Sequence, residues 1–222
     1  MRPSATNAES VDSSNEGNRP QPARRRSPRG DAARERILRV ALDSFADRGY
    51  RATSLNEIAR LAGLSMPGLL HHFPSKDELF AAVMQQQEEV DRALFDDLTA
   101  RSNPGAFEVL DGFVSMARIN RGRYGFVQLM HLIAAESAGG EYPGGENRRE
   151  HFRTARGFVE RALERGAAAG EIRADVDVKT LSAQVVAMIE GLENQWLQEP
   201  ETFDFVRLFE VWIEQLKDSI RV

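Results

Sequence analysis

The segment from Thr53 to Phe73 restricts the fold of this chain more than any other. Apolar residues recur at helical spacing before Gly63 and continue at that spacing after it. Ser65 can cap a second helix by accepting a hydrogen bond from the amide of Gly68, and Pro67 falls in the first turn, where a missing N–H costs nothing. The pattern predicts two short helices joined by a tight turn, which is a helix-turn-helix.

A helix-turn-helix of this kind buries one face and leaves the start of its second helix free to enter the major groove of DNA. The same pair of short helices also occurs as an ordinary part of an all-helical core. The spacing alone favours DNA binding and leaves that structural alternative open.

The residues around this segment extend the pattern. Arg34 to Met84 resembles the DNA-binding domain of the TetR family of bacterial transcriptional regulators. The resemblance implies an all-α protein, with an N-terminal helix-turn-helix domain of three helices and a C-terminal helical domain that binds a ligand and forms a dimer. Beyond this stretch the chain matches the family only in its helical character. The matching features are Ile37, Ala41, Phe45, Gly49-Tyr50, Thr53, Ile58-Ala59, Ala62-Gly63, His72-Phe73 and Ser75-Lys76.

Composition and charge indicate how the chain is divided. Residues 1–30 are expected to be a disordered Arg-rich tail, which either lies along DNA or remains solvated. Residues 31–76 are the expected DNA-binding domain, and 77–222 the expected effector-binding and dimerisation domain. Residues 1–76 carry 13 Lys and Arg against 8 Asp and Glu, whereas the remainder carries 16 against 26. A basic head on an acidic body suits a protein that contacts phosphate at one end, although chance would give the same asymmetry.

Several classes of protein are disfavoured. The chain has no cysteine, no secretion signal and no apolar run long enough to span a membrane, which favours a cytoplasmic protein without membrane contact. No Gly-rich phosphate loop, H-E-x-x-H or G-x-S-x-G motif occurs, so we do not expect an enzyme. His71 and His72 point about 100° apart on a helix, so no metal site is expected there. No cofactor is expected.

The expected DNA contacts lie before, within and just after the second helix of the motif. In the resemblance, the position of Thr53 contacts the DNA backbone. Met66 and Leu70 depart from the family, in which a polar residue and a tyrosine are common, and neither side chain can bond to guanine or phosphate. Sequence preference would then depend on thymine methyl groups together with Ser65 and His71. The full expected set is Arg51, Thr53, Ser54, Ser65, Met66, Pro67, Gly68, Leu70, His71 and Lys76.

The rest of the chain is expected to be helical. A long helix is predicted from Ser75 to about Arg101, and further helices at about 105–119, 123–138, 146–169, 177–198 and 202–220. The last two have more apolar surface than a single core needs, which predicts a homodimer closed by a four-helix bundle. The alternative is a hairpin buried within a monomer. The expected interface residues are Val185, Ile189, Leu192, Phe209, Trp212, Ile213 and Leu216.

In proteins that resemble this family, the middle helices enclose a small-molecule pocket. The mostly apolar candidates predict an apolar or aromatic effector, although methionines at helical spacing are more often ordinary core residues. The expected lining is Phe113, Met116, Met130, His131, Phe152, Arg156, Met188 and Trp196.

The sequence therefore predicts a homodimeric repressor that binds a palindromic double-stranded DNA operator and is released by a small-molecule effector. Two alternatives remain. One is a transcriptional activator, and the other is a helical protein that acts mainly through protein partners and binds DNA without sequence specificity.

Overall fold

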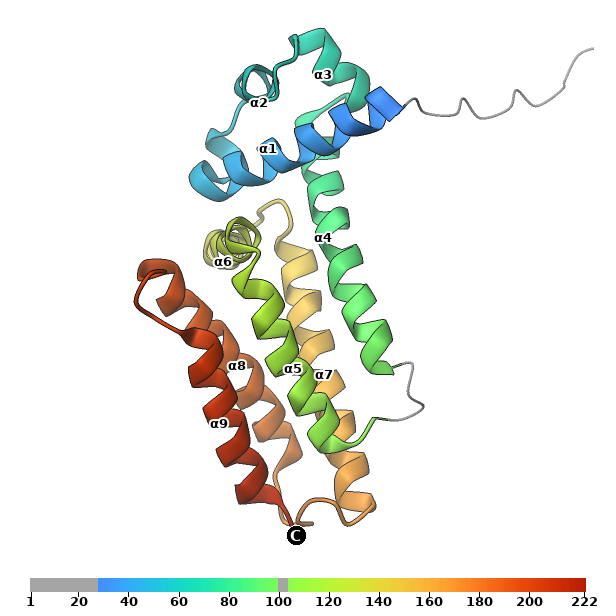
Figure 1. Cartoon of the computed structure of the whole chain (residues 1–222), viewed down its shortest axis with the longest axis vertical. Coiled ribbons are helices and arrows are strands. Elements are labelled where there is room, and N and C mark those ends of the chain that lie inside the picture. Colours follow the sequence, from blue (N-terminus) through green and yellow to red (C-terminus); the bar gives the residue numbers. More distant parts are fainter. Residues whose placement is uncertain (1–27, 100–103) are drawn as a thin grey trace, which may run out of the picture.

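The computed structural model describes residues 28–99 and 104–222, and every regular element in those ranges is a helix, as predicted. The predicted tail, residues 1–30, lies almost entirely outside the described residues. We call α1 to α3 the head and α4 to α9 the body (Figure 1). The helices are α1 (Pro28–Ala52), α2 (Leu55–Leu61), α3 (Met66–His72), α4 (Lys76–Thr99), α5 (Ala106–Arg121), α6 (Tyr124–Ser137), α7 (Gly145–Ala168), α8 (Val178–Gln198) and α9 (Phe205–Ile220).

The first helix organises the head. It starts at Pro28, and Asp31 lies in its first turn, where a carboxylate is favourable. Its regular path breaks at Gly49, because that residue has φ 76° and ψ 165°, which only glycine adopts readily. Phe45 is fully buried and meets the ring of Phe80 edge-on, with centroids 5.2 Å apart.

The turn between α2 and α3 has the predicted chemistry. Gly63 has φ 68°, and the amide of Leu64 donates to the carbonyl of Ala59 at 2.9 Å, which closes α2 with a Schellman motif. The hydroxyl of Ser65 then accepts from the amide of Gly68 at 3.2 Å. Together these bonds satisfy the end of one helix and the start of the next.

Two helices connect the head with the body. α4 begins beneath the head and descends along the body, while α6 crosses below α1 (Figure 1). The head core accordingly includes Phe126, Leu129 and Ile133 from α6 as well as Leu79 and Val83 from α4. Because one close-packed apolar core includes residues of these helices and of the head, a movement of α4 or α6 also shifts the helices of the head.

A second core fills the lower body. It lies among α5, α7, α8 and α9, and Val159, Leu163, Phe209 and Ile213 are each fully buried in it. Each of these side chains contributes about 1.5–3 kcal/mol by leaving water. Lys217 is buried too, and its ammonium is neutralised by contact with the carboxylates of Asp111 on α5 and Glu214 on α9.

Candidate functional site

The exposed start of α3 lies at the end of the head farthest from the body (Figure 1). Leu69 points inward and is fully buried, which fixes the opposite side of the helix toward solvent. That outer side carries Pro67, Leu70 and His71, all exposed, next to the half-buried Met66. The structure therefore brings these four predicted contacts together with Ser65 and Gly68 on one surface.

Thr53 is placed differently from the expectation. Its side chain is buried, and its hydroxyl lies 2.9 Å and 2.8 Å from the carbonyl oxygens of Ser44 and Gly49. The hydroxyl therefore holds the connection between α1 and α2 and is not presented to DNA. Ser54 is exposed and caps α2 by accepting from the amide of Glu57 at 3.2 Å.

Lys76 lies over the aromatic ring of Tyr50, and the guanidinium of Arg51 lies over the ring of Tyr142 at 5.7 Å. The ammonium of Lys76 sits 4.4 Å from the ring centroid and donates to the carbonyl of Arg51 at 3.3 Å. Burial lowers the pKa of Lys76, while neighbouring Asp77 opposes that shift. Burial is also the main reason that the pKa of Tyr50 rises to about 12, and its hydrogen bond to Asp77 adds to the effect. Lys76 is thus held at the first turn of α4.

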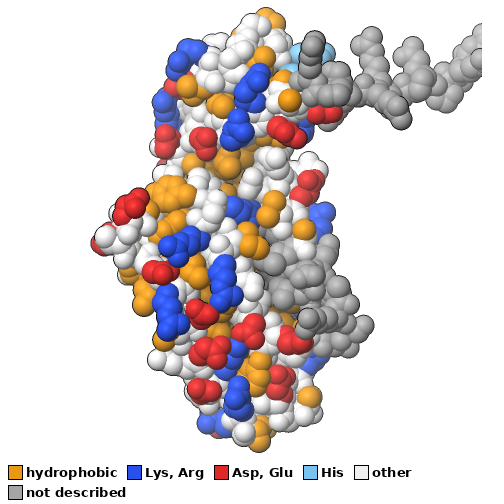
Figure 2. All heavy atoms as spheres, viewed as in Figure 1, with side chains coloured by type: hydrophobic (Ala, Val, Ile, Leu, Met, Phe, Trp, Pro, Cys, Tyr) orange, Lys and Arg blue, Asp and Glu red, His pale blue; other side chains and the backbone are white. Residues whose placement is uncertain are grey.

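The charge of the head is spread over its surface. Arg48 pairs with Glu57 at 2.5 Å, and Figure 2 shows basic and acidic side chains interspersed on this face of head and body. The basic side chains of the described part of the head are therefore not gathered into one patch on this face.

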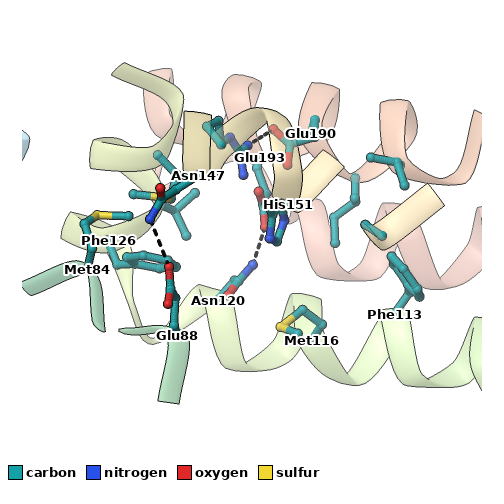
Figure 3. Close-up of a pocket in the computed structure, with 16 residues that line it drawn as sticks. Met84, Glu88, Phe113, Met116, Asn120, Phe126, Asn147, His151, Glu190 and Glu193 are labelled. Carbon is teal, nitrogen blue, oxygen red and sulfur yellow. Dashed lines mark hydrogen bonds and ion pairs between the residues drawn. The ribbon is translucent and has the colours of Figure 1, made fainter. Parts of the chain in front are cut away.

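The body contains a cavity of about 100 Å³ among α4, α5, α6, α7 and α8 (Figure 3). One part of its wall is apolar and the other holds seven polar side chains. The apolar wall is made by Met84, Phe113, Met116, Phe126, Val127, Met130, Ala155, Val186 and Ile189, and the polar wall by Glu88, Asn120, Asn147, Arg148, His151, Glu190 and Glu193.

Three predicted lining residues, Phe113, Met116 and Met130, belong to this wall. His131 lies next to the cavity, with its Nε2 3.5 Å from a carboxylate oxygen of Glu193. Phe152 does not line the cavity, because its ring stacks against the guanidinium of Arg148 at 4.2 Å.

The other three predicted lining residues lie elsewhere. Trp196 is buried between the rings of Tyr124 and Phe205, at centroid distances of 5.2 Å and 4.8 Å. Met188 borders a shallow groove on the outer face of α8, and Arg156 is half-buried on α7. Helical spacing identified these residues as partly inward-facing but could not say which interior space each one reaches.

None of the seven residues of the polar wall was among the lining residues predicted from the sequence. Glu193 is the clearest case, because it stands four residues after Ile189 and three before Trp196, within the inward stripe of α8. A carboxylate in an apolar stripe is a usable signal, since charged side chains are rarely buried without a partner. Asn120 and Arg148 carried no comparable signal, because their positions depend on how α5 and α7 pack against α8.

The predicted dimer residues divide into two groups. Val185, Ile189, Phe209 and Ile213 are buried within the single chain, so they support the surface and do not form it. Leu192, Trp212 and Leu216 are half-buried on the outer face of α8 and α9. The residues that border the groove on this face are Gln184, Ala187, Met188, Gly191, Leu192, Gln195 and Trp212.

Two structural properties bear on other classes of function. Within 28–99 and 104–222, no three His, Cys, Asp or Glu side chains are grouped so as to hold a metal ion. In the same ranges, no helix combines the length and apolarity that crossing a bilayer demands.

Known proteins resemble both halves of the chain. Residues 37–83 match the family described as "Bacterial regulatory proteins, tetR family", and residues 144–219 match "BetI-type transcriptional repressor, C-terminal". The transcriptional regulator RutR of Escherichia coli K12 is 45% identical over 62 residues, a match that spans 28% of this chain and only 29% of RutR. The transcriptional repressor AcnR of Corynebacterium diphtheriae is 23% identical over 187 residues, or 84% of this chain and 92% of AcnR.

Solved structures agree in fold. A TetR transcriptional regulator from Chloroflexus aurantiacus superposes with a TM-score of 0.72 at 24% identity, covering 88% of this chain and all of that one. The two family matches together take in more than half of the chain, and they include the head, with its capped α3, and the α7 to α9 region that borders the cavity. The chain is a member of the TetR family of transcriptional regulators.

Proposed function

We propose that this protein is a homodimeric transcriptional repressor that binds a palindromic operator and leaves it when a small molecule occupies the body cavity. The observation that carries the proposal is the exposed, capped start of α3 at the free end of the head. The similarity to AcnR, a transcriptional repressor, supports repression, and activation remains the alternative.

The surface of α3 supports a specific form of readout. Leu70 is 36% exposed and, with Pro67 and Met66, offers apolar contact to thymine methyl groups. His71 is the exposed hydrogen-bonding side chain beside them. Phosphate contacts would come from Arg51 and Ser54, which precede α2, and from Lys76, which follows α3. Such contacts set position but carry little sequence information. Readout by one head would be weak.

A dimer supplies the missing affinity, because two heads can occupy successive major grooves about 34 Å apart. The outer face of α8 and α9 suits self-association. Ala187 and Gly191 are small and exposed, which lets a second helix approach closely, and Trp212 and Leu216 flank them with apolar surface. The twofold contact would close a four-helix bundle from the two α8–α9 hairpins.

Coupling between cavity and head would run through α4 and α6. Leu79 and Val83 of α4 lie in the head core, and the next residue, Met84, lines the cavity. A second link comes from Tyr142, whose hydroxyl accepts from the amide of Tyr50 at 2.9 Å. An effector acts only by binding one arrangement of these links better than the other.

Selection of bound duplexes from a random DNA pool, by the purified full chain at near-physiological salt, tests the proposal. We expect enrichment of a palindrome whose half-sites are one helical turn apart. Absence of enrichment, with binding that disappears with salt for all sequences alike, would instead support non-specific binding and a role through protein partners. A reporter placed behind the recovered operator then separates repression from activation.

A further inference from the structure

The cavity has a buried acidic end. Glu193 is 4% exposed, and its side chain reaches the cavity from α8 (Figure 3). One of its oxygens accepts a hydrogen bond from the amide nitrogen of Asn120 at 2.7 Å. The other lies 3.5 Å from Nε2 of His131, beyond normal hydrogen-bond length. Burying a carboxylate costs free energy unless a cation or several hydrogen-bond donors stabilise its charge. Here the main donor is the side-chain amide of Asn120.

The guanidinium near this end is already engaged. Arg148, whose side chain is 5% exposed, bonds to the carboxylate of Glu190 and stacks on Phe152. Glu88 on α4 adds a third carboxylate, which is exposed to solvent and accepts from the amide of Asn147 at 3.4 Å. The lining therefore holds three carboxylates, one of them exposed to solvent, against one guanidinium, and the imidazole rings of His151 in the wall and His131 beside it are the other basic groups.

Unpaired polar atoms point to an absent molecule. Among the described residues, Oδ1 of Asn120, Nε of Arg148 and Nε2 of His131 are buried without a hydrogen-bond partner. Buried polar groups are nearly always bonded, so such a group of atoms around one cavity indicates a polar ligand or ordered water. Acceptors predominate at this end, since Asn120 adds a carbonyl oxygen to the carboxylates of Glu193 and Glu190.

The opposite wall is of a different nature. Phe113, Met116 and Met130 face the cavity with carbon and sulfur, and Val186 and Ile189 continue this surface. A ligand that fills the space needs an apolar body as well as a polar head. Flexible methionines allow bodies of different shape to be accommodated.

We propose that the ligand of this cavity is an amphiphilic organic cation, with an ammonium or amidinium group at Glu193 and Asn120 and an aliphatic or aromatic body against the Met116 wall. The inference rests on the proposed function in taking this cavity as the effector site, and it adds a positive charge to the expected apolar or aromatic effector. A carboxylate ligand would face the three acidic side chains, and Arg148 already pairs with Glu190, which leaves only its Nε buried without a partner. A neutral ligand would add no positive charge beside the buried carboxylate of Glu193.

A series of compounds with one body and three heads tests the charge directly. The probes are 4-phenylbutylamine, 4-phenylbutan-1-ol and 5-phenylpentanoate, titrated into the full chain by calorimetry at neutral pH. We expect the amine to bind at least about tenfold more tightly than the alcohol, because a hydrogen bond to a buried charge exceeds one between neutral groups. We expect the carboxylate to bind most weakly. Equal binding of all three, tighter binding of the carboxylate, or no binding of the amine at millimolar concentration overturns the proposal.

Glu193→Gln keeps the shape of the side chain and removes its charge. The preference for the amine over the alcohol should fall to about threefold or less, while Glu201→Gln, at an exposed residue outside the cavity, should leave the preference unchanged. Thermal unfolding verifies that the variant is folded. If Glu193→Gln does not fold, Glu190→Gln should reduce the preference in the same direction. A preference that survives in a folded Glu193→Gln protein contradicts the assigned position of the cation.

The charge preference and the effector role can fail separately. Release of the selected operator by the amine is measured by fluorescence anisotropy. Binding of the amine without release would support the ligand class and contradict the proposed effector role of the cavity. Release by the alcohol as efficient as by the amine would support the effector role and overturn the cation.

Discussion

One helix of the head, α2, and one helix of the body, α7, end at a glycine with the same geometry. In the head the chain then enters the exposed helix α3, which carries the proposed DNA contacts. In the head, α2 closes at Gly63 with φ 68°, and the amide of Leu64 bonds the carbonyl five residues back at 2.9 Å. In the body, α7 closes at Gly170 with φ 72°, and the amide of Glu171 makes the equivalent bond at 2.8 Å. The chain after Gly63 starts an exposed helix, whereas the chain after Gly170 pairs Ile172 with the last turn of the body.

This comparison separates local structure from function. The same glycine geometry can be read from sequence in both places, since both follow an apolar helical stripe. What differs is the surface that neighbouring elements leave uncovered. In the head this surface is the start of α3, and in the body it is a cavity enclosed by five helices.

The largest predicted effect concerns the outer face of the body. Trp212→Glu places a charge among Met188, Leu192 and Leu216, where the second chain is proposed to pack. We expect monomers by light scattering and a loss of operator affinity of about 100-fold or more, because each single head then binds alone. Gln86→Glu adds the same charge at an exposed position on α4 and should remain dimeric. A Trp212→Glu protein that is still dimeric would mean that this face does not hold the dimer.

The paired glycines give the next largest effect. Gly63→Ala and Gly170→Ala should each destabilise the fold by about 1–2 kcal/mol, because a left-handed backbone is strained for alanine. Neither added methyl group would meet another atom within 4 Å, so strain alone sets the cost. Thermal unfolding should therefore show similar losses, while operator binding at low temperature should fall only for Gly63→Ala. A binding defect in Gly170→Ala would show that this turn also positions the heads.

The sequence predicted local features far better than the cavity. Gly63, Ser65 and the break at Gly49 could be recognised, because each depends on neighbours within one or two helical turns. The surroundings of Glu193 could not, since its partner Asn120 is on another helix and only the packing of α5 against α8 brings them together. The all-α class followed from periodicity. Which stripe faces solvent did not, so interior residues were included in the predicted interface.

A smaller effect is predicted where head and body meet. Tyr142→Phe removes the acceptor for the amide of Tyr50 but keeps the ring, and should cost about 1 kcal/mol in thermal unfolding. Tyr124→Phe is the matched change within the body. Its hydroxyl donates to the carbonyl of Leu197 at 3.1 Å in an exposed setting, where water can replace it, so we expect a loss of at most about 0.5 kcal/mol. Equal losses would mean that the bond to Tyr50 contributes no more than a surface contact.

The smallest predicted change is in the free energy of DNA binding, and it comes from substitutions on the head that separate phosphate contacts from base contacts. Lys76→Ala should weaken binding a few-fold for every DNA sequence and reduce the salt dependence by about one phosphate per protomer. Met66→Ala should leave average affinity nearly unchanged but alter the preferred bases, because its side chain lies at the start of α3. Competition binding across a panel of operator variants at two salt concentrations measures both. Lys76 is also bonded to the carbonyl of Arg51, so Lys76→Arg, which keeps the charge, should retain the salt dependence. If Lys76→Ala and Met66→Ala lowered DNA affinity equally for every operator variant, the start of α3 would not contact bases. The exposed surface of the head would then bind DNA only through phosphate.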